Sequence, residues 1–191
     1  MRTSLILVGI ISMSLTGLVT SSTAQDVTPR VTKLFEETSY YLKDVAFIDA
    51  STGWAVGDVH WDQAQRRYTG TVIKTTDGGV TWSSPVPVDA ANQDNDEPDI
   101  IELPDGRLLC AMRTNAGAET MMWQSFSTDR GLTWSPSAPM AFTGHAPYLL
   151  RTTRGALLCA HRMPGTSLHV SGDEGATWGG NVPIDTCIGA Y

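Results

Sequence analysis

Short runs of apolar and β-branched residues alternate with polar, glycine-containing turns through most of the chain. Three of these runs are TGTVIK, MMWQSF and SLHV, and each stands before a polar phrase of the form S/T-x-D-x-G-x-T-W. Runs of this length, bounded by turn residues, are typical of β-strands. Few stretches show the 3.6-residue period of a helix, so the pattern predicts an all-β fold.

The polar phrase occurs three times at a nearly regular spacing. Its copies are TTDGGVTW (75–82), STDRGLTW (127–134) and SGDEGATW (171–178). The aspartates at positions 77, 129 and 173 are 52 and 44 residues apart. A period in the forties indicates one supersecondary unit per repeat, and a propeller blade is the unit that fits.

Each phrase has the composition of a hairpin turn. The aspartate can accept hydrogen bonds from the backbone just ahead of it, and glycine supplies a backbone conformation that other residues resist. A tryptophan closes each phrase and can bury a large surface. We therefore interpret Asp77, Asp129 and Asp173 as structural, and we expect Trp82, Trp134 and Trp178 to be largely buried.

A second repeat lies between these turns. EPDIIELPDGRLLCAMR (97–113) aligns without gaps on APYLLRTTRGALLCAHR (146–162), and seven of the seventeen positions match. PDGR and TRGA fit tight turns between two apolar strands. The unit is therefore predicted to be strand, glycine turn, strand, loop, strand, Asp turn, strand. Cys110 and Cys159 fall on equivalent strands, where they are expected as small buried hydrophobes rather than as a disulfide.

The first 24 residues have the pattern of a secretory signal peptide. Arg2 precedes the apolar run LILVGIISMSLTGLV, and the small residues Ser22, Thr23 and Ala24 follow it. We expect this leader to be removed, which leaves a domain at 25–191 that is secreted or periplasmic and has no further contact with a membrane. The alternative is an uncleaved N-terminal anchor.

The net charge and the pattern of metal-ligating residues argue against some classes of partner and site. The formal net charge is −7, which argues against nucleic acid as a partner. The three cysteines form no C-x-x-C pair, and the four histidines lack the spacing of a zinc site, so no metal and no cofactor are predicted. An odd number of cysteines in an exported chain implies at least one thiol that is free or bridges to another molecule.

The eight-residue phrase resembles the Asp-box, or BNR repeat, of the sialidase superfamily of β-propellers. The resemblance covers roughly Val45–Tyr191. It implies a six-bladed propeller with four-stranded antiparallel blades, of which this chain would supply three to four. We therefore expect residues 25–191 to form a partial sialidase-like propeller.

The resemblance also implies a reaction, the release of a terminal acidic sugar from a glycan or sialoside with retention. An acidic sugar carries a carboxylate next to the reacting carbon, and paired arginines can hold that group with forked bonds. A tyrosine activated by a glutamate serves as nucleophile, and a carboxylic acid protonates the leaving oxygen.

Several residues match the positions of that machinery. Glu97 precedes the ELPDGRLL hairpin and Arg113 ends it, as the tyrosine's partner and a carboxylate-binding arginine do in the family. Arg162 precedes the last Asp-box, and Tyr191 in CIGAY matches the nucleophile. The general acid is expected near Asp62, with Asp58 as a second candidate by position. His145 aligns with Asp96, and it is expected either to cap a turn or to touch a ligand.

The N-terminal region departs from this pattern. In YYLKDVAF (40–47) Lys43 stands where the family has an arginine, and lysine cannot make the forked contact. LKDVAFIDASTGWAVG also resembles the repeats of photosystem-assembly-factor-like propellers, which bind partners rather than hydrolyse them. A non-catalytic BNR propeller that binds glycan or protein is therefore the alternative function. Glu97 lies in the acidic run NQDNDEP (92–98), which we expect to be solvated.

Overall fold

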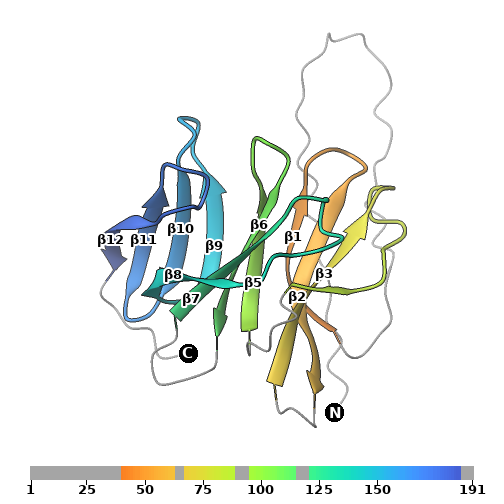
Figure 1. Cartoon of the computed structure of the whole chain (residues 1–191), viewed down its shortest axis with the longest axis horizontal. Coiled ribbons are helices and arrows are strands. Elements are labelled where there is room, and N and C mark those ends of the chain that lie inside the picture. Colours follow the sequence, from red (N-terminus) through yellow and green to blue (C-terminus); the bar gives the residue numbers. More distant parts are fainter. Residues whose placement is uncertain (1–39, 63–66, 89–94, 115–120, 186–191) are drawn as a thin grey trace, which may run out of the picture. The chain divides into compact units, whose positions relative to one another are not determined.

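The described part of the chain contains β-strands and no helix. The computed structural model describes residues 40–62, 67–88, 95–114 and 121–185. These residues form twelve strands in three four-stranded antiparallel sheets (Figure 1). The strands are β1 (Tyr40–Phe47), β2 (Gly53–Asp62), β3 (Arg67–Thr75), β4 (Val86–Pro87), β5 (Asn95–Glu102), β6 (Leu108–Thr114), β7 (Met121–Ser127), β8 (Ala138–Thr143), β9 (His145–Arg151), β10 (Leu157–Arg162), β11 (Thr166–Ser171) and β12 (Gly179–Asp185).

Each sheet is a simple meander in which strands that follow one another in the chain are neighbours. We call β1–β4, β5–β8 and β9–β12 the first, second and third blade. Their order of strands and turns is the one predicted from the two repeats, and the all-β propeller prediction is confirmed. The first strands of the blades are β1, β5 and β9, and β5 contacts both of the others in the middle of the array (Figure 1). We call them the inner strands.

The apolar run of β6 is buried on both faces because the second blade lies between the other two. Leu108, Cys110 and Met112 pack in one cluster with Trp54 of the first blade. The residues between them, Leu109 and Ala111, pack in a second cluster with residues of the third blade. Successive side chains of a strand point to opposite faces, so one unbroken apolar strand can serve two interfaces. Cys110 and Cys159 are buried free thiols, as expected.

The three Asp-boxes form turns of one geometry between the third and fourth strands of the blades. In the second box, Asp129 accepts bonds from the Ser127 hydroxyl at 2.8 Å and from the Thr133 amide and hydroxyl at 2.8 and 2.5 Å. Asp77 and Asp173 accept the equivalent bonds in their own turns. The bonds, led by the threonine hydroxyl, lower the pKa of each Asp-box carboxyl to about 2. The side-chain bonds within each box therefore stabilise a turn.

The boxes also join neighbouring blades. The indole nitrogen of Trp54 in the first blade donates to the Arg130 carbonyl in the second box, at 3.1 Å. Gln124 in the second blade donates to the Gly175 carbonyl in the third box, at 2.8 Å. Gly175 has a φ of 84°, and a Cβ there would lie 3.1 Å from Leu109, so conformation and space both favour glycine.

The tryptophans that close the boxes are largely buried, although none of the three is fully enclosed. They lie at the rims of the clusters, where Trp134 packs against the first and Trp178 against the second. Trp82 makes an edge contact with Phe47, with ring centroids 6.4 Å apart. Trp54, which no box contains, is the tryptophan that the first cluster buries fully.

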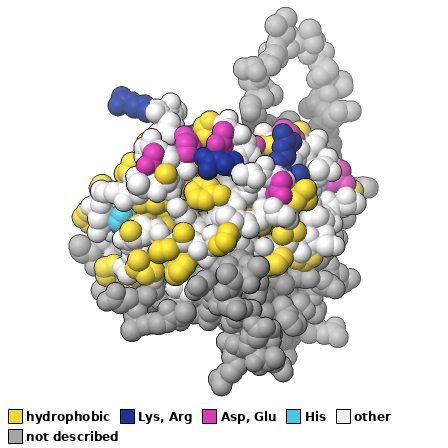
Figure 2. All heavy atoms as spheres, in the orientation of Figure 1, with side chains coloured by type: hydrophobic (Ala, Val, Ile, Leu, Met, Phe, Trp, Pro, Cys, Tyr) yellow, Lys and Arg dark blue, Asp and Glu magenta, His cyan; other side chains and the backbone are white. Residues whose placement is uncertain are grey.

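Hydrophobic side chains are exposed on the third blade. They include Tyr148 and Leu150 of β9 and Val182 and Ile184 of β12. Figure 2 shows hydrophobic side chains gathered on the side of the molecule that carries this blade, and charged side chains along the upper edge. Within the described residues no helix is long and apolar enough to cross a membrane. The predicted leader and Cys187 lie outside the described residues.

Replacement of Asp129 by alanine is expected to lower the free energy of unfolding by about 1 to 3 kcal/mol, because the amide and hydroxyl of Thr133 lose their acceptor. Urea unfolding of the purified chain measures the change. Thr128→Ala is the matched control, since Thr128 is an exposed residue of the same turn. Equal unfolding midpoints for the two variants would contradict a structural role for the Asp-box.

Candidate functional site

The meander brings the start of each inner strand and the end of the next strand to the same end of a blade. Lys43 lies on β1, Glu97 near the start of β5, and Arg113 near the end of β6. Arg162 ends β10, at the equivalent position of the third blade. The Asp-boxes follow the third strands, so they lie at the opposite end from these residues.

A β-bulge marks this end of every inner strand. The register shifts between Leu42 and Asp44 in β1 and between Asp96 and Asp99 in β5. In the third blade, two residues of β9 lie opposite one residue of β10, between the pairs Ala160–Tyr148 and Arg162–His145. Bulges re-aim side chains and are frequent beside active sites.

Glu97 occupies the bulge in an uncommon backbone conformation. Its φ is 48°, and Ala146, its counterpart in the gapless alignment, has the same value. A side chain in this left-handed region costs free energy, which surrounding contacts have to offset. The turn of the backbone directs the carboxylate of Glu97 towards the third blade.

The carboxylate of Glu97 lies between two guanidinium groups. Arg162 Nη2 donates to its Oε1 at 2.7 Å, and Arg113 Nε forms an ion pair with its Oε2 at 2.8 Å. The backbone amide of Ala146 donates to the same Oε2 at 2.8 Å. The structure therefore brings Glu97, Arg113 and Arg162, which the sequence repeat placed together, into direct contact.

Asp96 joins this cluster, although sequence reasoning did not select it. Arg113 Nη2 donates to its carboxylate at 2.5 Å, and Lys43 Nζ lies 4.0 Å from its other oxygen. Asn95 is buried and Asp96 is partly buried, so this part of the acidic run is not solvated, which corrects the expectation for these two residues. Residues 92–94 of the run lie outside the described residues. The alignment of Asp96 with His145, itself a site candidate, was the signal that could have identified it.

His145 starts β9 beside the arginines. Burial lowers its pKa, and the positive charges of Arg113 and Arg162 lower it further. A histidine in this position stays neutral at neutral pH, so it offers a hydrogen bond rather than a charge. It therefore belongs to the candidate site in position, as the alignment indicated.

The structure does not describe the side chains of the other predicted site residues. Asp58 and Asp62 belong to β2, and their side chains lie outside the described residues. Tyr191 also lies outside the described residues, so its predicted approach to Glu97 stays a prediction.

The two arginines differ in how far they reach solvent. The side chain of Arg113 is 17% exposed and is held by Asp96 and Glu97, whereas that of Arg162 is 52% exposed. A guanidinium offers five donors in a planar fork, and Arg162 uses one of them on Glu97. The cluster can thus present donors to an anion from outside while Glu97 fixes the distance between the two arginines.

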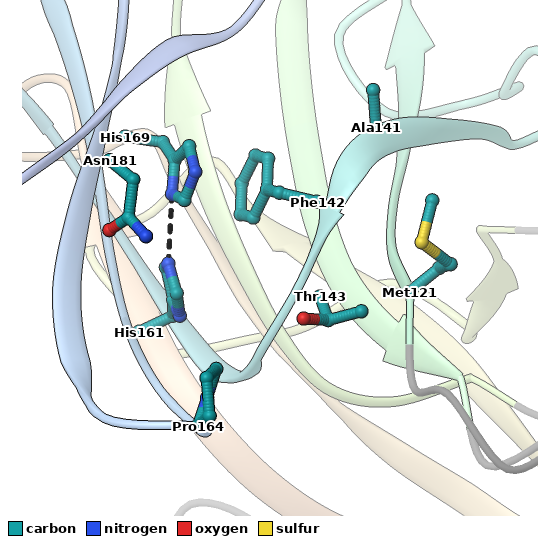
Figure 3. A pocket seen from close by; sticks show the side chains of 8 residues that line it. All are labelled: Met121, Ala141, Phe142, Thr143, His161, Pro164, His169 and Asn181. Atoms are coloured by element: carbon teal, nitrogen blue, oxygen red, sulfur yellow. Dashed lines mark hydrogen bonds between the residues drawn. The ribbon is translucent and has the colours of Figure 1, made fainter.

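A cavity of about 340 Å³ opens between the end of the second blade and the third blade (Figure 3). Phe142 of β8 stacks on His169 with ring centroids 3.8 Å apart, and His169 Nδ1 lies 2.9 Å from His161 Nε2. Met121, Thr143, Pro164 and Asn181 complete much of the lining. The two histidines are buried and share a proton in a hydrogen bond, so they act as neutral packing groups.

The described residues hold no cluster of three or more histidine, cysteine, aspartate or glutamate side chains suited to a metal ion. The groups that the structure describes at the site are the carboxylates of Asp96 and Glu97, the guanidinium groups of Arg113 and Arg162, and the side chains of Lys43 and His145.

Comparison with known families identifies the fold in which this cluster lies. The family model for the BNR repeat-like domain matches residues 51–185. The chain belongs to this family. None of the curated proteins compared with the chain matches it.

Solved structures share the fold of this BNR repeat-like domain at low sequence identity. A protein of unknown function from Dyadobacter fermentans is 22% identical, with a TM-score of 0.61 over 71% of this chain and 39% of its own. The Hadza microbial sialidase Hz136 is 19% identical, with a TM-score of 0.55 over 73% of this chain and 36% of its own. The GH93 α-L-arabinofuranosidase of Fusarium graminearum, solved with arabinobiose, is 16% identical, with a TM-score of 0.57 over 77% of this chain and 50% of its own. The chain thus spans half or less of the length of each of these proteins.

The buried histidine pair generates a pH-dependent prediction. Burial lowers the pKa of both residues, and the neighbouring His161 lowers that of His169 further. The unfolded chain therefore takes up protons first as the pH falls below about 6.5, so the pair's contribution to stability is lost on acidification. The double variant H161Q/H169Q removes both groups. As the pH is lowered from about 7.5 to about 5, the free energy of unfolding of this variant is expected to rise relative to that of the wild type, as measured by urea unfolding. A constant difference across this range would show that the pair is not held neutral.

Proposed function

We propose that this BNR repeat-like domain is an exported glycoside hydrolase of the sialidase type, which releases a terminal acidic sugar with retention. One observation carries the proposal: guanidinium groups from equivalent positions of two neighbouring blades meet at one carboxylate, at 2.7 and 2.8 Å. Such a pair is suited to a planar anion, because each fork can donate two parallel bonds to it.

Arg113 and Arg162 bind the sugar's carboxylate in this proposal. Glu97 holds the two guanidinium groups apart at a fixed distance, and its remaining lone pairs accept the proton of Tyr191, the nucleophile. Asp62 protonates the leaving oxygen. A tyrosine is suited to this attack because a carboxylate nucleophile would be repelled by the substrate's own carboxylate.

The arginines favour an acidic sugar over a neutral one. The structural neighbours include both a sialidase and an arabinofuranosidase solved with arabinobiose, a neutral disaccharide. A neutral sugar offers hydroxyl groups, which leave the positive charge of the exposed Arg162 without a counterpart in the substrate. A carboxylate supplies that counterpart.

A non-catalytic glycan-binding propeller is the second candidate, and Lys43 favours it. Lys43 lies on the inner strand at the position where the resemblance implies an arginine, and it faces Asp96 at 4.0 Å. A lysine provides charge without the fork. Such a site retains attraction for an acidic sugar while it holds the sugar less rigidly for attack.

Binding and turnover separate the two candidates. The chain is titrated with N-acetylneuraminic acid and with arabinobiose by calorimetry, and it is assayed on a fluorogenic aryl sialoside. We expect the acidic sugar to bind and arabinobiose not to bind. Turnover that Tyr191→Phe abolishes would support the hydrolase. Binding without turnover would leave the glycan-binding alternative, and binding of arabinobiose alone would contradict both.

Arg162→Ala is expected to weaken binding of the acidic sugar by about ten- to a hundredfold, since a charge-assisted contact is lost. Arg162→Lys restores the charge but not the fork, so it is expected to recover only part of the affinity. Arg154→Ala is the matched control, because Arg154 is an exposed arginine in the turn at the other end of the same hairpin. Equal affinities for R162A and R154A would contradict the proposed role of Arg162.

A further inference from the structure

The third blade exposes apolar side chains on the face that points away from the second blade. Along β9, Leu149 packs in the cluster shared with the second blade, so its neighbours Tyr148 and Leu150 point to the opposite face. Tyr148 is 60% exposed and Leu150 is 50% exposed. Val182 of β12, which lies next to them in the same blade and pairs with Leu168, is exposed as well. Exposed apolar side chains that gather on one face mark a contact surface.

The face of the second blade that packs on the third blade has the same construction. Four of its apolar residues lie in the shared cluster, namely Ile101, Leu109, Ala111 and Phe126. In the aligned hairpins and Asp-boxes the third blade has an apolar residue at each of these positions, namely Leu150, Leu158, Ala160 and Val170. The strand pairing agrees, because Leu109 pairs with Phe126 and Leu158 pairs with Val170. The third blade therefore presents the kind of face on which another blade of this fold packs.

The opposite kind of face, which receives a preceding blade, is left exposed on the first blade. Ile100 of β5 and Leu149 of β9 are 4% and 6% exposed, because each packs in a cluster with the preceding blade. Val45 occupies the same place on β1, since all three pair with the second-strand residue that lies opposite the fourth residue before the Asp of the box. Its neighbour Ala46 packs towards the second blade, so Val45 points away from it and is 38% exposed. A second copy of the chain thus offers the face that the third blade lacks.

We propose that the third blade of one copy of this chain packs on the first blade of a second copy, with Leu150 on one side of the contact and Val45 on the other. The contact repeats the way in which the second blade joins the third. Because it uses two different faces, it is head-to-tail, and copies join in a ring or in an open row. It places β1 of the second copy beside β9, whose first residue, His145, lies in the candidate site. The inference concerns assembly, and it holds whether or not the site hydrolyses a sugar.

A glutamate on either face tests the contact by sedimentation velocity of the purified full chain. The wild type is expected to associate at micromolar concentrations. Leu150→Glu and Val45→Glu are each expected to weaken association at least about tenfold, because the contact would bury an unpaired charge. Leu132→Glu is the matched control, since Leu132 is an exposed leucine in the turn of the second Asp-box, and L132E should associate like the wild type. A wild type that stays monomeric, or a V45E variant that associates normally, would overturn the proposal.

A mixture of the two variants distinguishes the head-to-tail contact from pairing of two third blades. L150E keeps an intact first blade and V45E keeps an intact third blade, so an equimolar mixture is expected to form a dimer that neither variant forms alone. Association that L150E loses and V45E keeps would show that two third blades pair with each other. That result would overturn the proposal, and so would a mixture that stays monomeric.

Hydrogen exchange of the wild-type chain tests the contact without a variant that has to fold. As the chain concentration is raised through the range of association, amides of β1 and β9 are expected to exchange more slowly, because both strands enter the contact. Amides of β6 are the internal control, since this strand is already enclosed between two blades of one copy. Exchange of β1 and β9 that does not depend on concentration would overturn the proposal.

Discussion

The inner strand of a propeller blade has one edge that no strand pairs, and the amide groups on that edge need acceptors. In this chain the acceptors for β9 are carboxylates of the neighbouring blade. Glu97 accepts from Ala146 N and Asp99 accepts from Leu149 N. This cross-blade capping puts acidic side chains in the middle of the molecule. Two arginines balance the charge of Glu97, whereas burial raises the pKa of Asp99 to about 8.

The surroundings of the two carboxylates differ because Glu97 lies nearer the open end of β5 than Asp99 does. Glu97 lies in a bulge at the open end of the strand, where Arg113 and Arg162 reach it from the second strands of two blades. Asp99 lies deeper, where the second strands carry the thiols of Cys110 and Cys159 and offer no cation. One strand thus carries a charged cluster that is open to a ligand and a buried carboxyl that accepts from an amide of the third blade.

The sequence predicted what local patterns and exact repetition determine. The Asp-box turns are defined by side-chain bonds within a few residues, and the aligned hairpins predict that Glu97, Arg113 and Arg162 lie at strand ends on the same side of the blades. It could not predict the burial of Asp96, because an acidic run looks solvated until an arginine from another strand covers it. The bond from the Leu149 amide to Asp99 joins two blades, so no local pattern contains it. The box tryptophans are not fully enclosed because they lie at the rim of the apolar layers.

The proposed function depends most on Arg113 and Arg162, which together would form a receptor for a sugar carboxylate. Nitrogen-15 NMR of the arginine side chains measures this directly, since each Nε–H group gives its own signal. The account predicts that N-acetylneuraminic acid shifts the signals of Arg113 and Arg162 with one common affinity, while arabinobiose shifts neither and the signal of Arg154 does not move. Shifts confined to other arginines, or equal shifts with the neutral disaccharide, would contradict it.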